Sequence, residues 1–86
     1  GGAVNAVARQ NRSLLPAGVI DVLGSFDRGD IVSILEPARA QVACGIANYP
    51  SDELVRIKGL RSDRISDVLG HQYGDEVVHR SNMVLL

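Results

Sequence analysis

The chain has 86 residues, which limits it to one small domain, because a typical domain holds roughly 100 to 200 residues. Nine Lys and Arg against ten Asp and Glu give a formal net charge of −1, so no overall field attracts the chain to phosphates or anionic lipid. Hydrophobic residues make up 45% and aromatic residues 3%, which leaves aliphatic side chains to build the core. Length and charge therefore exclude a two-domain enzyme and restrict any nucleic-acid role to a local patch.

The first half of the sequence predicts one helix and three strands. Apolar residues recur at helical spacing over residues 3–12, which predicts a short amphipathic helix. Pro16 and Gly18 then predict a shaped loop, because proline removes a backbone donor and glycine accepts positive φ. Runs rich in β-branched residues, separated by turn residues, predict strands over residues 19–23, 31–35 and 41–47.

The second half predicts two short helices and two strands. Ser51 places a capping hydroxyl before two acidic residues and begins a helix that Gly59 can end. Ser62 begins a second such unit, which ends at Gly70 in a left-handed conformation. Strands are predicted over residues 77–79 and 83–86. The order indicates an α+β fold, a small, mostly antiparallel β pseudo-barrel with short helices.

A single cysteine, Cys44, leaves no partner for an internal disulfide and no second thiol for a zinc site with His71 or His79. Within a strand of Val and Ala, Cys44 is expected to be a small core residue and not a reactive thiol. No uncharged run approaches the roughly 20 residues that a membrane helix needs. We therefore expect a cytoplasmic chain with no metal site and no membrane contact.

The sequence predicts no catalytic residues. It contains neither a GxxxxGK[ST] loop nor a GxGxxG loop after a strand, so neither of these nucleotide-binding devices is present. His79 is interpreted as a partly buried histidine hydrogen-bonded to the backbone or to a carboxylate, and less readily as a general base. His71 follows a stop glycine and is expected to be exposed.

Two groups of cations are candidates for phosphate contacts. The first group is Arg56, Lys58, Arg61 and Arg64. Its first two members are interpreted as complementing the negative end of the helix that begins at Ser51, and its last two as solvated charges. The other group leads from the helix predicted over residues 3–12 into the glycine loop, and its candidate RNA-binding residues are Arg9, Arg12, Pro16 and Gly18. For that group, RNA binding and a purely structural loop remain open alternatives.

Several segments give the sequence a family resemblance. They are SLLPAGV at 13–19, GSFDRGD at 24–30, YPSDEL at 49–54, IKG at 57–59, LG at 69–70 and VHRSNM at 78–83. Together they resemble the carboxyl-terminal domain of bacterial glutamate 5-kinase. The first two segments are shared more widely by PUA domains, which are named after pseudouridine synthase and archaeosine transglycosylase.

The resemblance implies one PUA-like domain over residues 1–86, the C-terminal part of a longer chain, with an accessory, regulatory or assembly role. The parent enzyme would use ATP and magnesium to phosphorylate L-glutamate to L-glutamate 5-phosphate, the first step of proline biosynthesis. Its catalytic groups would lie in an N-terminal amino-acid-kinase domain, which is the implied partner, and homo-oligomer formation stays open. The alternative is an RNA-binding module of an RNA-modifying enzyme, holding RNA with the first helix and the glycine loop.

The sequence also departs from the family pattern. The usual first strand precedes Gly2 in the family and is lacking here, so we expect an open barrel edge that invites pairing with another chain. Ala38 stands where the family usually carries glycine, and alanine disfavours positive φ in that turn. Ser81 replaces a commoner aspartate, which weakens an ionic role for the neighbouring His79–Arg80 pair.

Overall fold

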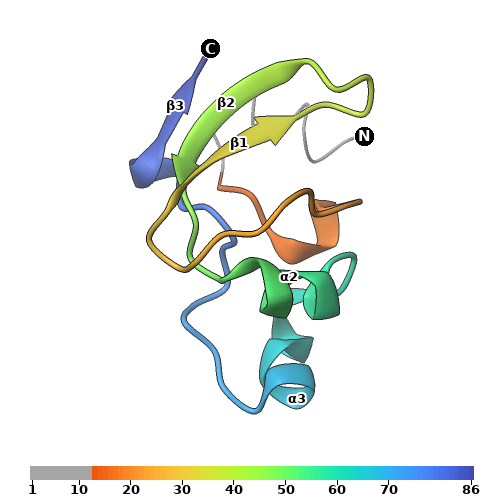
Figure 1. Cartoon of the computed structure of the whole chain (residues 1–86). Coiled ribbons are helices and arrows are strands. Elements are labelled where there is room, and N and C mark those ends of the chain that lie inside the picture. The colour runs from red at the N-terminus through yellow and green to blue at the C-terminus, as the bar shows by residue number, and fades with distance from the viewer. Residues whose placement is uncertain (1–12) are drawn as a thin grey trace.

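The structure is a computed structural model that describes residues 13–86, so the predicted helix over residues 3–12 lies outside the described residues. In chain order its elements are η1 (Pro16–Gly18), β1 (Ile31–Leu35), β2 (Gln41–Ile46), α2 (Ser51–Ile57), η2 (Ser62–Arg64), α3 (Ile65–Leu69), η3 (Arg80–Asn82) and β3 (Met83–Leu85), where η denotes a 3-10 helix. The sheet lies at one end of the molecule, and α2 and α3 lie at the other end (Figure 1). The predicted α+β class is confirmed.

The sheet has the strand order β1-β2-β3, and both strand pairs are antiparallel. Ile34 pairs with Ala43 across β1 and β2, and Gly45 pairs with Met83 across β2 and β3. The backbone N–H of Leu86 also donates to the Val42 carbonyl at 3.0 Å, which continues the second ladder beyond β3. Within residues 13–86 the sheet is not closed, because β1 and β3 each pair only with β2, and this agrees with the expected open edge.

The core joins the inner face of the sheet to the two helices. Ile34 and Ala43 come from the sheet, whereas Leu54 and Ile57 come from α2 and Ile65 from α3. Aliphatic side chains dominate this core, as the composition predicts. The remaining buried members of the cluster are Leu14, Tyr49, Val77 and Val78.

The predicted strand over residues 19–23 is wrong. Val19 and Val22 pack against the core, whereas Ile20 and Leu23 are 68% and 48% exposed. The two side chains that pack against the core are therefore three residues apart, whereas one face of a pleated strand takes every second residue. β-Branched residues favour a strand only where a sheet offers a place for it. This segment has no neighbouring strand to pair with in residues 13–86, so its composition alone does not make it a strand.

The predicted strand over residues 77–79 is also wrong in extent. It reduces to one isolated antiparallel bridge between Val78 and Leu14, where the Leu14 N–H donates to the Val78 carbonyl at 2.9 Å. The strands predicted over 31–35, 41–47 and 83–86 are confirmed as β1, β2 and β3, with β2 and β3 each one residue shorter. A strand persists only where a partner satisfies its backbone groups on consecutive residues.

Both predicted helices form, but their predicted serine caps are wrong. The residue before α2 is Pro50, and the Ser51 hydroxyl instead accepts from the Phe26 N–H at 3.0 Å and donates to the Phe26 carbonyl at 3.2 Å. The Ser62 hydroxyl donates to the Asp75 carbonyl at 2.9 Å. Both serines therefore tie a helix start to a distant loop. The end of α3 at Gly70, with φ of 79°, is as predicted.

The hairpin turn between β1 and β2 contains one strained residue. Arg39 has φ of 71°, and its N–H donates to the Glu36 carbonyl at 2.8 Å. The positive φ expected near Ala38 therefore occurs at the next residue, Arg39, which is not glycine either. A non-glycine residue in this region costs about 1 to 2 kcal/mol.

Candidate functional site

The loop that carries two of the candidate RNA-binding residues is anchored in the core. Pro16 is fully buried, and its carbonyl accepts the N–H of Gly59 at 2.8 Å and of Val19 at 3.0 Å. The Ser13 hydroxyl accepts the N–H of Arg80 at 2.9 Å. Gly18 ends the 3-10 turn and is half-buried. The loop is therefore a fixed turn that presents backbone at its surface, while the proline ring itself faces inward.

Only part of the predicted RNA-binding group can be placed. Pro16 and Gly18 belong to the same 3-10 turn, so the structure brings these two together. Arg9 and Arg12 lie outside the described residues. RNA binding by this group therefore stays a prediction.

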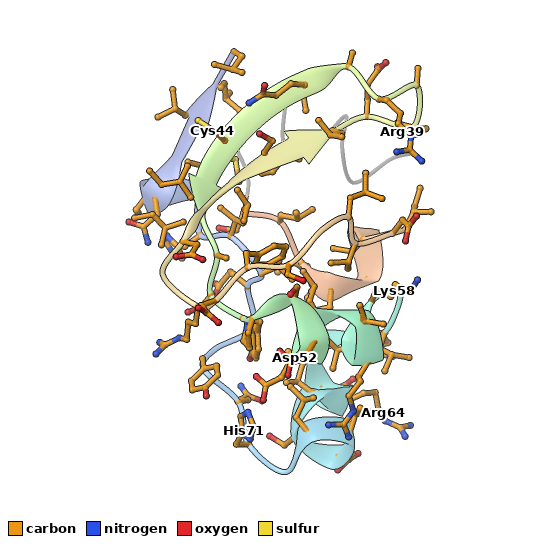
Figure 2. All side chains as sticks on the ribbon, in the orientation of Figure 1. Arg39, Cys44, Asp52, Lys58, Arg64 and His71 are labelled. Atoms are coloured by element: carbon orange, nitrogen blue, oxygen red, sulfur yellow. The ribbon has the colours of Figure 1, made fainter. Side chains whose placement is uncertain are left out.

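The cations near the helix junction each have a nearby partner. Lys58 lies 3.7 Å from Asp21, Arg61 lies 3.3 Å from Asp63, and Arg64 lies 3.4 Å from Asp67. Figure 2 labels Lys58 and Arg64 on the helical side of the molecule. Such exposed pairs contribute little stability, but each carboxylate offsets the charge that a phosphate would need.

Arg56 lies in the last turn of α2 and Lys58 is its C-cap residue, as predicted, but the groups that they contact belong to other segments. The Arg56 guanidinium donates to the Val68 carbonyl of α3 at 2.6 Å, and Lys58 faces Asp21 from the first half of the chain. Arg56 thereby connects the two helices, and Lys58 connects α2 to the segment after η1. The expected solvent exposure of Arg61 and Arg64 is confirmed.

Sequence reasoning missed a cluster of aromatic and polar groups around Tyr49. This side chain is fully buried, and its hydroxyl donates to the Gly74 carbonyl at 2.6 Å and accepts the Tyr73 N–H at 3.0 Å. Burial raises the pKa of the Tyr49 hydroxyl, an effect that the Tyr73 N–H opposes. The ring centroids of Tyr49 and Tyr73 are 5.3 Å apart, and the Arg28 guanidinium carbon lies 4.1 Å above the centre of the Tyr73 ring.

The same cluster extends to the start of α2. Glu53 lies 2.7 Å from the His71 Nε2, and its other carboxylate oxygen is buried without a hydrogen-bond partner. The Asn48 side-chain amide donates to the Tyr73 carbonyl at 3.2 Å and to the Glu76 carbonyl at 3.0 Å. The cluster fixes the loop after α3 against β2 and α2. Its partners are far apart along the chain, so no local spacing signals it.

The structure places both histidines at the surface and the cysteine on the sheet, outside the core. His79 accepts the Ser81 N–H at 3.0 Å through Nδ1, which confirms the backbone hydrogen bond, but His79 is exposed and the predicted partial burial is wrong. His71 is exposed, as predicted. Cys44 is half-buried and does not belong to the core cluster, because Ala43 and Gly45 take the inward positions of β2.

An apolar cavity of about 550 Å³ separates residues 18–23 from β1. Its floor includes the core residues Leu14, Leu54 and Val78, and Glu36 and Arg39 also line it. The lining is suited to apolar groups of a polypeptide or ligand. Within residues 13–86 no three His, Cys, Asp or Glu side chains are grouped to hold a metal ion. No helix in that part of the chain has the length and apolar character needed to cross a membrane.

An unclosed antiparallel sheet, two short helices and an anchored proline–glycine turn define a small α+β domain of the pseudo-barrel class. The family model that matches the chain is the PUA domain, over residues 1–69. The chain belongs to the PUA domain family.

The curated relatives that the chain matches are much longer proteins. The chain is 48% identical over 85 residues to a glutamate 5-kinase of Moorella thermoacetica, covering 99% of the chain and 22% of that protein. It is 50% identical over 84 residues to a glutamate 5-kinase of Thermus thermophilus, covering 98% of the chain and 23% of that protein. The match falls in the C-terminal region of these proteins. The chain thus spans less than a quarter of their length.

A solved structure supports the fold. The crystal structure of a PUA domain from Aeropyrum pernix K1, a tartrate complex, aligns with a TM-score of 0.63 and 30% sequence identity. The alignment covers 91% of this chain and 37% of that chain. The predicted PUA-like fold is confirmed.

We expect Tyr49→Phe to lower the free energy of unfolding by about 1 to 3 kcal/mol, because the Gly74 carbonyl and the Tyr73 N–H would lose a buried partner. Urea denaturation measures this change. Tyr73→Phe, at a side chain that is 43% exposed, is the matched control and should change little. Equal unfolding free energies for the two variants would contradict the role of the Tyr49 hydroxyl.

Proposed function

We propose that this chain is the non-catalytic PUA domain of a glutamate 5-kinase. The observation that carries the proposal is 48% identity over 99% of the chain to a protein of that name. The anchored loop and the Tyr49 cluster support a structural module, because their polar groups are engaged in bonds between distant segments of the domain.

The parent enzyme would transfer the γ-phosphate of ATP, with magnesium, to the side-chain carboxylate of L-glutamate. The product, L-glutamate 5-phosphate, would begin proline biosynthesis in the cytoplasm. Phosphoryl transfer needs a phosphate cradle, a metal ion and stabilisation of developing charge. We assign these tasks to an N-terminal amino-acid-kinase domain, because this chain contains neither of the nucleotide-binding glycine loops considered above.

The domain would act through assembly or regulation of the whole enzyme, including formation of a homo-oligomer. We also propose that residues 1–86 are one domain at the C-terminal end of the longer protein, and that the preceding polypeptide supplies the barrel's first strand. Among residues 13–86 the outer edge of β1 has no paired strand, and an apolar cavity lies beside it; both features support this arrangement, since both suit an added extended segment.

Glutamate-dependent release of ADP from Mg-ATP tests the proposal on the full-length gene product and on the same protein with residues 1–86 deleted. We expect both proteins to turn over and the separate 86-residue chain to show no activity. Omitting glutamate provides the background rate. A full-length protein without glutamate-dependent turnover, or a separate chain that has it, would overturn the assignment.

The second candidate function is RNA binding through Arg9, Arg12, Pro16 and Gly18. The fixed turn at Pro16–Gly18 favours it, because a rigid loop presents its backbone to a ligand with little loss of conformational entropy. The balanced net charge of −1 weighs against tight binding.

If the chain binds RNA, a structured RNA titrated at low salt should bind in the micromolar range. Arg9→Glu combined with Arg12→Glu should abolish that binding. Arg61→Glu combined with Arg64→Glu, which makes the same charge change at two exposed cations, should retain most of it. Absence of binding at micromolar RNA would reject this candidate.

A further inference from the structure

The outer face of the sheet is apolar, and most of its residues are exposed. Antiparallel partners lie on the same face, and the register pairs Ile31 with Ile46 and Cys44 with both Ser33 and Val84. Leu86 follows Val84 by two residues and continues the same row. Ile31, Val84 and Leu86 are 78%, 61% and 71% exposed. We call this surface the outer sheet face; it consists of Ile31, Ser33, Val42, Cys44, Ile46, Val84 and Leu86, of which Val42 and Cys44 are half-buried and the others exposed.

No charged side chain belongs to the outer sheet face. A surface that meets phosphate needs cations, so the face does not fit nucleic acid. Protein surfaces that stay in water carry charged residues among their apolar ones, whereas surfaces that are permanently covered resemble a core cut in half. The composition of the face therefore fits a lasting protein contact.

We propose that the outer sheet face docks against the N-terminal part of the same longer polypeptide. The inference rests on the proposed function, because the chain covers only 22% of a relative that it matches in the C-terminal region. A covalently joined partner has an effective concentration on the order of millimolar, which favours it over a second copy that must be found by diffusion. The face, and not the glycine loop, is then the contact between the domains.

Cys44 provides a reporter at the centre of this face, on β2 beside β3 (Figure 2). Its rate of maleimide labelling is measured by peptide mass spectrometry in the full-length protein, over a range of protein concentrations. Val84→Glu places a charge directly opposite Cys44, and Val55→Glu makes the same change at a valine of α2 that is 50% exposed. A carboxylate near a thiol disfavours the reactive thiolate, so a faster reaction in Val84→Glu reports that the face has been uncovered.

We expect slow labelling of Cys44 in the unchanged protein at every concentration, and labelling faster by about tenfold or more in Val84→Glu but not in Val55→Glu. Ser33→Glu charges the same face without removing an apolar group, so it decides the matter if Val84→Glu fails to fold. Fast labelling in the unchanged protein would overturn the proposal. Protection that disappears on dilution together with a fall in assembly mass would also overturn it, in favour of a second copy.

The proposed function is checked separately on the same samples. Glutamate-dependent ADP release reports on the identity of the parent enzyme, whereas Cys44 labelling reports on the docking of this face. Protection of Cys44 in a protein without kinase turnover would refute the kinase assignment and keep the docking. Kinase turnover with a freely labelled Cys44 would keep the kinase assignment and refute the docking.

Discussion

The fold depends on the close approach of β2 to the segment that leads into β3. A Cβ atom built at Gly45 would lie 2.6 Å from the Val78 Cγ1 and 2.8 Å from the Asn82 carbonyl oxygen. Only glycine permits this distance. Because Val78 also bridges Leu14, the contact joins the central strand, the carboxyl-terminal segment and the anchored loop into one core.

The two ends of the domain differ in the polar contacts that they carry. At the helical end, Arg56 and Lys58 are held by a carbonyl and a carboxylate, and Tyr49 fixes the loop that follows α3. At the sheet end, the outer face carries apolar side chains and no charge. The domain therefore has a polar end and an apolar end, and the apolar end is the one that we propose to dock.

Local signals predicted much of the fold. Apolar runs bounded by turn residues identified β1 and β2, and Gly70 identified the end of α3, because these features depend on neighbours in sequence. Residues 19–23 have the composition of a strand but no pairing partner among residues 13–86, and the Ser51 hydroxyl bonds to Phe26, 25 positions away. Pairing and long-range hydrogen bonds are decided by the whole fold, and a single sequence does not reveal them.

The candidate site was harder to predict than the fold. Pro16 is a predicted RNA contact whose role stays a prediction, and its burial and the bond from the Gly59 N–H to its carbonyl show that it also anchors the loop. The cluster around Tyr49 was missed, because its partners Tyr73 and Gly74 come from a distant loop. Residue type alone shows which groups can bind, whereas packing decides which of them are free to do so.

The contact at Gly45 can be tested directly by Gly45→Ala with native-state amide hydrogen exchange. The account predicts a loss of about 1 to 3 kcal/mol in unfolding free energy and faster exchange of the Leu14 and Val78 amides, because the new methyl group must displace Val78. Ser33→Ala, on the exposed face of the adjacent strand, should leave both quantities nearly unchanged. Unchanged stability and exchange in Gly45→Ala would contradict the claim that this approach holds the domain together.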